Sequence, residues 1–105
     1  FLAIGSPGGS RIITAVLQII LNVIDFEQSL EEATDSKRVH HQWYPDDIDI
    51  EETYNQINEL MDLGYKIDII DTATCTQSIM IDDNEFIGVS DLRRPDSLAL
   101  GVKND

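Results

Sequence analysis

The sequence predicts an α+β fold in which an antiparallel sheet carries its helices on one face. Three observations support this class: an apolar run at residues 1–4 leads into a glycine-rich loop, a long apolar helical pattern follows at once, and the second half alternates apolar and polar residues around a polar turn. A chain of 105 residues has room for one small hydrophobic core. We therefore treat residues 1–105 as a single fragment, which we expect to be a piece of a larger protein.

The first two elements are a strand and a helix. Residues 1–4 predict a short buried strand, because they are apolar and are followed directly by the letters GSPGGS. A helix with Ser10 as its N-cap should follow, and its apolar residues cover most of its circumference, so we expect deep burial. Polar residues nevertheless recur along it at spacings of three and four, and the run is shorter than the ~20 residues of a membrane span. The sequence therefore predicts no membrane span.

The middle of the chain contains a second helix start and an aromatic connection. Ser29 and Glu32 have the spacing of a capping box, which predicts a short helix to about Thr34. Residues 38–45 are aromatic and end at Pro45, a residue that cannot donate a ladder hydrogen bond. We interpret this segment as a packed connection.

The second half predicts three further strands and one helix. A brief strand around residues 48–50 precedes a helix that Gly64 should end through a left-handed conformation. The residues that we expect this helix to turn inward are Tyr54, Ile57, Leu60 and Met61. Alternation at 65–69 indicates a half-buried strand. Residues 76–81 and 85–90 flank an Asp-Asp-Asn turn and predict a hairpin.

The composition excludes several classes of partner and site. Lys and Arg total 7 against 20 Asp and Glu, a formal net charge of −13, which repels nucleic acid. The single cysteine, Cys75, forms neither an internal disulfide nor a cysteine-based zinc site. Packing and hydrogen bonding are favoured over metal binding for His40 and His41. The acidic residues between 46 and 52 lack the spacing of a calcium loop and are interpreted as a solvated face.

The glycine-rich loop at residues 5–10 is the main candidate for chemistry. It stands before a helix start, where consecutive backbone amides can face a negative ligand atom. Gly8 and Gly9 let the backbone approach a substrate closely. From these residues alone a tight turn is favoured, because the spacing fits neither a P-loop nor a dinucleotide motif. Arg11 is expected to anchor the loop.

Read together, four motifs resemble those of the γ-glutamyltransferase small subunit, in their usual order along nearly the whole chain. They are GSPGGSRIIT from residue 5, HHQW from residue 40, TQSIM from residue 76 and GVSD from residue 88. The resemblance implies the C-terminal part of that subunit, with the αββα sandwich of N-terminal-nucleophile hydrolases. The chain departs from the family at Lys37 and Leu92, where proline is frequent, and at Thr74, where glycine is common.

The resemblance also implies an activity. A threonine exposed by self-cleavage of a precursor attacks a γ-glutamyl amide such as glutathione, and the acyl group passes to water or to an amino acid or peptide. The backbone amides of Gly8 and Gly9 would form the oxyanion hole, while the threonine would lie upstream of Phe1. The chemistry needs no cofactor and no metal. The isolated fragment is therefore predicted to be inactive.

The resemblance further implies partners and a location. The expected partners are the rest of the small subunit, the large subunit of the same precursor and γ-glutamyl small molecules. Self-association of the isolated fragment is expected, since apolar surface would lack cover. The family suggests a periplasmic or extracellular location. Two alternatives stay open: a non-catalytic acidic binding module, and a relative that acts on poly-γ-glutamate.

Overall fold

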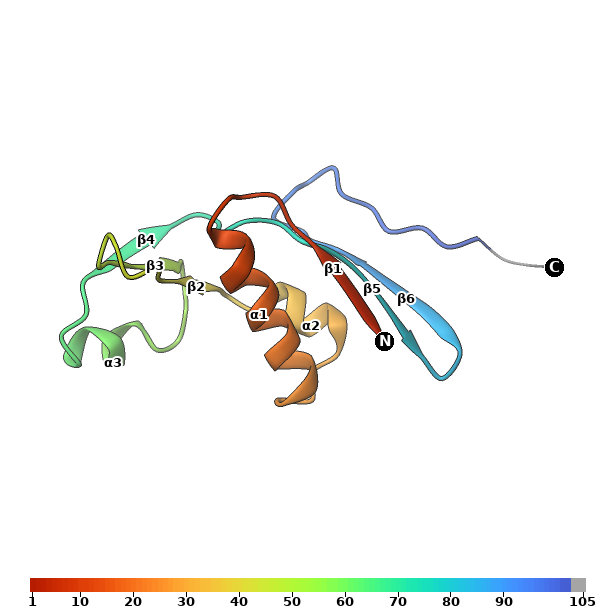
Figure 1. Ribbon diagram of the computed structural model, residues 1–105, viewed down its shortest axis with the longest axis horizontal. Coiled ribbons are helices and arrows are strands. Elements are labelled where there is room, and N and C mark those ends of the chain that lie inside the picture. The colour runs from red at the N-terminus through yellow and green to blue at the C-terminus, as the bar shows by residue number, and fades with distance from the viewer. Residues whose placement is uncertain (103–105) are drawn as a thin grey trace.

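The computed structural model describes residues 1–102 and confirms the α+β class. Its strands form two sheets, with the orders β1-β5-β6 and β2-β3-β4. Figure 1 shows the two sheets toward opposite ends of an elongated molecule, with α1 and α2 on one side of the first sheet. The helices that cover this sheet thus lie on a single face, as the sequence predicts.

The first sheet joins the start of the chain to the predicted hairpin. β1 (Leu2–Gly5) pairs antiparallel with β5 (Gln77–Asp82), which pairs antiparallel with β6 (Glu85–Ser90). In the turn between β5 and β6, Asp83 has φ 48° and Asn84 has φ 64°. Asp and Asn tolerate this left-handed conformation better than other residues with side chains. The predicted hairpin is confirmed.

The core lies between this sheet and two helices, α1 (Arg11–Ile24) and α2 (Leu30–Asp35). Ile19, Leu30 and Ala33 form its buried centre. Five half-buried residues from the strands and α1 pack against this centre, namely Leu2, Ile4, Val23, Met80 and Val89. Burial of apolar surface at about 25 cal/mol per Å² makes this layer the main contribution to stability.

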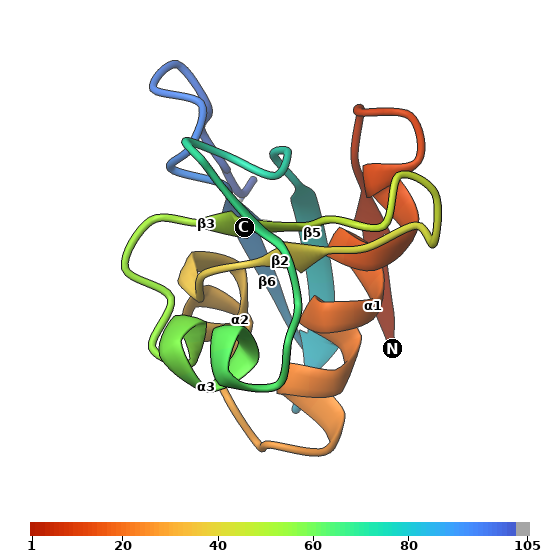
Figure 2. The same ribbon diagram turned by 90° about the vertical axis from the view of Figure 1, so that its left-hand side faces the viewer.

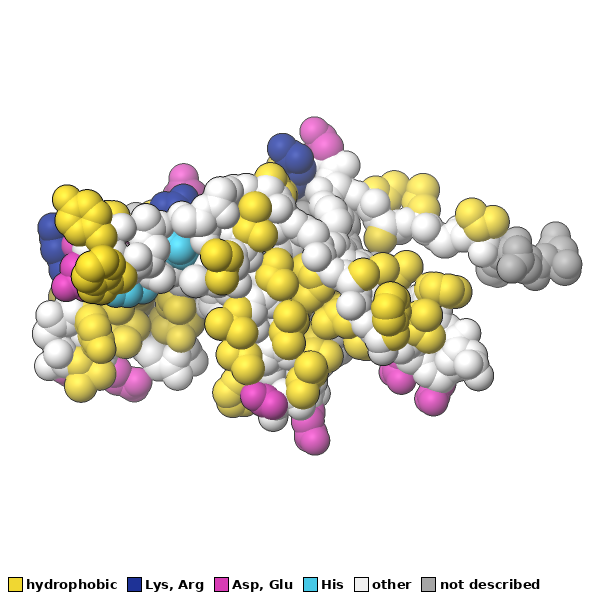
Figure 3. All heavy atoms as spheres, viewed as in Figure 1, with side chains coloured by type: hydrophobic (Ala, Val, Ile, Leu, Met, Phe, Trp, Pro, Cys, Tyr) yellow, Lys and Arg dark blue, Asp and Glu magenta, His cyan; other side chains and the backbone are white. Residues whose placement is uncertain are grey.

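The predicted deep burial of α1 is wrong for this chain. One face carries buried Ala15 and Ile19, but the opposite face is open, with Ile13 72% and Ile24 66% exposed. Figure 3 shows hydrophobic side chains gathered over α1 on the outer surface. The helix is apolar on two sides, and the described residues cover only one of them. We call the open side, Ile13, Leu17, Leu21 and Ile24, the outer face of α1.

The predicted cap of α2 is confirmed with one change of partner. The backbone amide of Glu32 donates to the Ser29 hydroxyl oxygen at 3.1 Å. The Glu32 carboxylate accepts a hydrogen bond at 3.0 Å from the Ser29 hydroxyl, where a backbone amide was expected to be the donor. One free amide of the helix start is therefore satisfied by a side chain.

The second sheet contains a parallel pair that the sequence pattern did not indicate. β2 (Val39–His40) pairs antiparallel with β3 (Ile48–Glu51), and β3 pairs parallel with β4 (Ile67–Ile70). α3 (Ile57–Asp62) lies in the connection between β3 and β4, as a parallel pair requires a crossover. Gly64, with φ 94°, follows the end of α3 as predicted.

The predicted inward face of α3 is confirmed in part. Tyr54, Ile57 and Leu60 are half-buried, whereas Met61 is 56% exposed and α3 has no fully buried residue, because the described residues place no further layer over this helix. Figure 2 shows α3 at the periphery, beside the second sheet. Beyond β2, the expected packed connection is open, with Trp43 and Tyr44 exposed. Within residues 1–102, no helix combines the length and apolar character needed to cross a membrane.

Candidate functional site

The loop between β1 and α1 presents two free backbone donors. We call residues 6–9 the glycine loop; within it Gly8 has φ 121° and Gly9 has φ 60°. The carbonyl oxygens of these glycines accept from Arg11 N at 3.2 Å and from Ile12 N at 3.1 Å. In the part of the chain that the structure describes, the amides of Gly8 and Gly9 donate to no protein oxygen. Unpaired amides at a helix start favour a negatively charged ligand atom.

Glycine is required at these two positions for different reasons. A Cβ at Gly8 would lie 2.8 Å from Thr74 Oγ1, so a side chain there has neither the space nor the backbone conformation. A Cβ at Gly9 would meet nothing within 4 Å, so only its left-handed φ is unfavourable for other residues. The open side of Gly9 leaves room for an external group beside its amide.

A pocket of about 430 Å³ adjoins the glycine loop. Its lining consists of Gly8, Gly9, Ser10, Arg11, His40, Gln42, Pro45, Asp47, Asp49 and Asp68. Arg11 Nη2 lies 2.8 Å from Asp49 Oδ2, which confirms the predicted anchoring role of Arg11. This ion pair ties the start of α1 to β3 across one side of the pocket.

A chain of hydrogen bonds holds the other side of the helix start. Ser10 Oγ donates to Gln42 Oε1 at 2.7 Å, so it does not cap α1 as expected. The Gln42 amide nitrogen donates to the Tyr44 carbonyl, which fixes the orientation of its side chain. His40 Nε2 lies 2.9 Å from Gln42 Oε1, to which it can donate, and His40 Nδ1 lies 2.6 Å from Thr14 Oγ1. His40 is a buried linker between α1 and β2.

Polar residues of α1 thus face the second sheet instead of solvent. The Gln18 side chain donates to the Val39 carbonyl at 2.8 Å and accepts from the Val39 amide at 2.9 Å. These two bonds imitate the pairing of one more strand beside β2. The polar stripe of the helix is therefore the contact that fixes α1 to β2.

Metal-binding side chains are not gathered anywhere in residues 1–102: no group of three or more His, Cys, Asp or Glu residues is placed to hold an ion. His41 is exposed and its Nε2 lies 2.9 Å from Asp46 Oδ1. Cys75 is a half-buried free thiol.

Four charged side chains form a buried ionic cluster that sequence reasoning missed. Its members are Arg38, Glu51, Asp91 and Arg93, which come from segments far apart in the chain. Arg38 Nη2 lies 2.9 Å from Asp91 Oδ2, and Arg93 Nη2 lies 2.5 Å from Glu51 Oε1. Arg93 Nη1 joins the pairs through Asp91 Oδ1 at 3.1 Å. Two cations and two anions leave the cluster formally neutral, as burial demands.

The cluster controls the ionisation of its own members. Burial raises the pKa of Glu51 and Asp91, but hydrogen bonds from Arg93 and from backbone amides, together with the arginine charges, outweigh it, so both pKa values are lowered. Burial and then the charge of Arg93 lower the pKa of Arg38. Burial by itself would lower the pKa of Arg93. The hydrogen bond and the charge of Glu51, together with Asp91, outweigh burial, so the pKa of Arg93 is raised. All four groups are charged at neutral pH.

This cluster corrects the interpretation of the acidic segment as a solvated face. Glu51 is 1% exposed, whereas its neighbour Glu52 is exposed. The sequence carried one weak signal, since arginine and lysine total only 7 residues in a chain with 20 acids. Each arginine or lysine could pair with any of many acidic residues, so the partners of Arg38 and Arg93 could be identified only from the structure.

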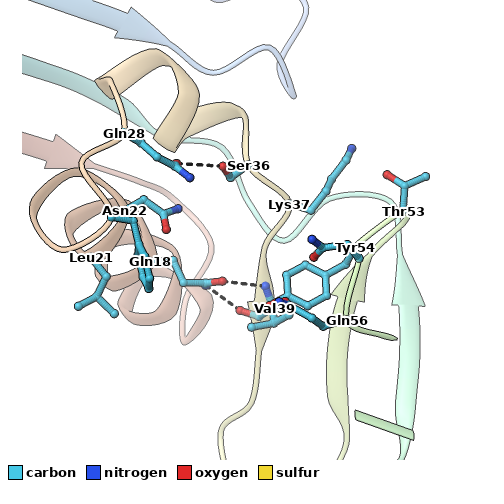
Figure 4. Close-up of a pocket in the computed structure, with 12 residues that line it drawn as sticks. Gln18, Leu21, Asn22, Gln28, Ser36, Lys37, Val39, Thr53, Tyr54 and Gln56 are labelled. Atoms are coloured by element: carbon cyan, nitrogen blue, oxygen red, sulfur yellow. Dashed lines mark hydrogen bonds between the residues drawn. The ribbon is translucent and has the colours of Figure 1, made fainter. Parts of the chain in front are cut away.

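A larger hollow of about 640 Å³ lies between α1 and the segment that precedes α3. Figure 4 shows that its labelled side chains are mostly amides and hydroxyls, and that Gln18 and Gln28 bond within the protein to Val39 and Ser36. The backbone amides of Asn55 and Gln56, which line this hollow at the start of the short helix α3, also donate to no protein oxygen among residues 1–102, but its lining contains no glycine that would open the backbone to an external group. The pocket beside the glycine loop is therefore the candidate site.

Solved structures place the fold in a known class. The chain superimposes with a TM-score of 0.88 on a γ-glutamyltranspeptidase from Pseudomonas nitroreducens solved in complex with L-DON, at 34% identity, covering 97% of this chain and 55% of that chain. Proteins of this kind are N-terminal-nucleophile hydrolases, so the chain is an α+β fragment of that fold.

The sequence itself identifies the family. Residues 1–101 match the family described as Gamma-glutamyltranspeptidase, and the chain belongs to it. It is 43% identical over 104 residues to a glutathione hydrolase proenzyme of Escherichia coli K12, covering 96% of this chain and 18% of that protein. It is 33% identical over 99 residues to glutathione hydrolase proenzyme 2 of Schizosaccharomyces pombe, covering 89% of this chain and 16% of that protein. The chain thus spans less than a fifth of these relatives.

Proposed function

We propose that this chain supplies the oxyanion hole of a γ-glutamyltransferase, in which the backbone amides of Gly8 and Gly9 bind the oxygen of a γ-glutamyl carbonyl under attack. The observation that carries the proposal is that both amides lack an internal acceptor while both residues line a pocket at the start of α1. The names of the relatives, glutathione hydrolase proenzymes, support γ-glutamyl amides such as glutathione as the substrate class.

In the proposed reaction, the hydroxyl oxygen of a threonine outside residues 1–105 bonds to the γ-carbonyl carbon while its proton passes to that threonine's own α-amine, and the carbonyl π electrons move to oxygen. The two glycine amides stabilise that negative charge, which is present only in the tetrahedral intermediate and the transition states beside it. Collapse breaks the carbon–nitrogen bond, and the departing amine takes the proton that the threonine α-amine received from the hydroxyl. Water or an amine then releases the γ-glutamyl group from the threonine through a second tetrahedral intermediate at the same site.

The surroundings favour donors that are fixed before the substrate arrives. Arg11 ties the helix start to Asp49, and Ser10 ties it to Gln42. Fixed donors stabilise developing charge without reorganising during the reaction, which is where most of the benefit of an oxyanion hole arises. Under this proposal the chain acts with the rest of its subunit and with a large subunit from the same precursor, and alone it is inactive.

The experiment measures release of p-nitroaniline from γ-glutamyl-p-nitroanilide by the complete protein that contains this chain. Gly9→Ala forces a left-handed alanine and displaces the amide, so kcat should fall by about 100-fold, in the range of a lost oxyanion donor. Gly64→Ala is the matched control, since Gly64 also has positive φ and open space around a Cβ but lies after α3.

The control should lose stability comparable to that of Gly9→Ala and keep its kcat. Equal kcat for the two variants would count against Gly9 as a donor. A correctly folded complete protein without any γ-glutamyl transfer or hydrolysis would instead favour the non-catalytic binding module.

A further inference from the structure

Thr74 connects the glycine loop to the residues before β5 through hydrogen bonds. The register of the first sheet places it there, because Gly5 pairs with Gln77 and the loop leaves β1 beside the residues that precede β5. The Thr74 hydroxyl donates to the Pro7 carbonyl, and Thr74 Oγ1 lies 3.0 Å from Ser6 Oγ. Within residues 1–102, no other group outside the loop and α1 hydrogen-bonds to residues 6–9.

Thr74 also fits the backbone of Gly8 closely. A Cβ built on Gly8 would lie 2.8 Å from Thr74 Oγ1 and 3.2 Å from Thr74 Cβ. The threonine therefore occupies the side of Gly8 where a side chain would stand. Movement of the loop toward β5 is blocked by this contact, and movement away from β5 breaks the bond to the Pro7 carbonyl.

The buried ionic cluster holds the backbone on both sides of Thr74. Arg38 Nη1 donates to the Thr74 carbonyl at 3.0 Å, and the Ala73 amide donates to Glu51 Oε2 at 2.9 Å. The Thr76 amide donates to Asp91 Oδ2 at 2.9 Å. Hydrogen bonds to buried charged groups are among the strongest in proteins. The segment that carries Thr74 is thereby fixed to the residue before β2, to β3 and to the residue that follows β6.

We infer that Thr74 is a positioning residue, which transfers the rigidity of the buried ionic cluster to the Gly8 and Gly9 amides through its hydroxyl. The inference rests on the proposed function and deepens it. A donor must stay within hydrogen-bond distance of the forming oxyanion, and a displacement of about 1 Å at a reacting centre costs on the order of 100-fold in rate. Loss of the Thr74 hydroxyl should shift the Gly8 and Gly9 amides by less than about 1 Å, so the loss of rate should be smaller than about 100-fold.

The test compares Thr74→Val, Thr74→Ser and the control Thr72→Val in the complete protein. Thr72 is exposed, and its hydroxyl makes no hydrogen bond among residues 1–102. Each variant is assayed for kcat and KM with γ-glutamyl-p-nitroanilide. Inhibition by the boronic acid analogue of glutamate is measured as well, because its tetrahedral adduct with a hydroxyl nucleophile places an oxygen where the oxyanion forms.

Thr74→Val should lower kcat by about 10-fold and weaken boronate inhibition by a similar factor, with KM within about two-fold of wild type, the pattern of a lost transition-state interaction. Thr74→Ser, which keeps the hydroxyl, should stay within about three-fold of wild type in kcat. If Thr74→Val does not fold, Thr74→Ala carries the same expectation.

An active wild type in which Thr74→Val matches Thr72→Val in kcat and in boronate inhibition would overturn the inference and leave the proposed function standing. Equal losses in Thr74→Val and Thr74→Ser would also overturn it, because the hydroxyl would then not be the cause. An inactive wild type would remove the proposed function and this inference together.

Discussion

At the scale of single residues, the buried ionic cluster is the costliest feature to disturb. Removal of one member of a buried, hydrogen-bonded ion pair leaves an uncompensated charge and typically costs about 3–5 kcal/mol. Glu51 accepts hydrogen bonds from Arg93 and from the backbone amides of Arg38 and Ala73. One carboxylate of β3 therefore joins the residue before β2, the segment before β5 and the segment after β6.

The lowered pKa values of Glu51 and Asp91 predict a specific acid sensitivity. A carboxyl group with a lowered folded-state pKa adds stability above its unfolded pKa of about 4, and this contribution is lost as the pH falls through the lower folded value. In the complete protein, Glu51→Gln should reduce the thermal unfolding midpoint at pH 7 and should flatten its further decline between pH 5 and pH 2.

The control for this prediction is Glu52→Gln, the exposed neighbour, which should follow the wild-type curve. A Glu51→Gln protein whose midpoint falls with acid as steeply as that of the wild type would show that the cluster does not control acid stability.

At the scale of elements, the hairpin of β5 and β6 carries the base of the glycine loop. β5 pairs with β1 up to Gly5, and β6 leads directly to Asp91 in the ionic cluster. The turn between the strands has two residues with positive φ, Asp83 and Asn84. Two-residue turns of this kind match the twist of the strands, and their second position favours glycine.

The turn therefore predicts stability changes of opposite sign. Asn84→Gly should raise the free energy of unfolding by about 0.5 kcal/mol, because glycine adopts positive φ without steric cost. Asn84→Val should lower it by about 1–2 kcal/mol, because a β-branched residue is strained there. Chemical denaturation measures both, and shifts in the same direction would contradict the assigned turn.

Local signals were the part of the fold that the sequence could predict. Ser29 with Glu32, the Asp-Asn turn and Gly64 each act within a few residues, so their spacing determines the outcome. The cluster of Arg38 and Arg93 with their carboxylates depends on contacts between distant segments, and one acidic residue in a row of several gives no sign of which will be buried. The incomplete burial of α3 has a related reason, since apolar spacing identifies the inward face of a helix but does not show whether another element covers it.

At the scale of the site, the sequence pattern of the glycine loop was enough to locate it, but the residues that hold the loop in place could not be predicted from the sequence. Gly8 and Gly9 lie at a helix start, as their place between a strand and a helix indicates. Thr74 was recognised as a departure from the family pattern, while its contact with the loop depends on the pairing of β1 with β5. The hydrogen bonds of Ser10 and His40 with Gln42 likewise depend on how β2 packs against α1.

At the scale of the whole molecule, the outer face of α1 is an apolar surface that residues 1–102 leave uncovered. Its exposed residues, Ile13, Leu17, Leu21 and Ile24, follow helical spacing and form one apolar stripe. We propose that the rest of the subunit covers this stripe in the complete protein. Self-association of the isolated chain and a periplasmic or extracellular location stay predictions.

The most direct test is a crystal structure of the complete protein with the boronic acid analogue of glutamate bound to its nucleophile. The account predicts that one boron-bound oxygen lies about 2.7–3.1 Å from the backbone nitrogens of Gly8 and Gly9, the range of an oxyanion hole. A bound oxygen held by other donors, with both glycine nitrogens more than about 3.5 Å away, would contradict it.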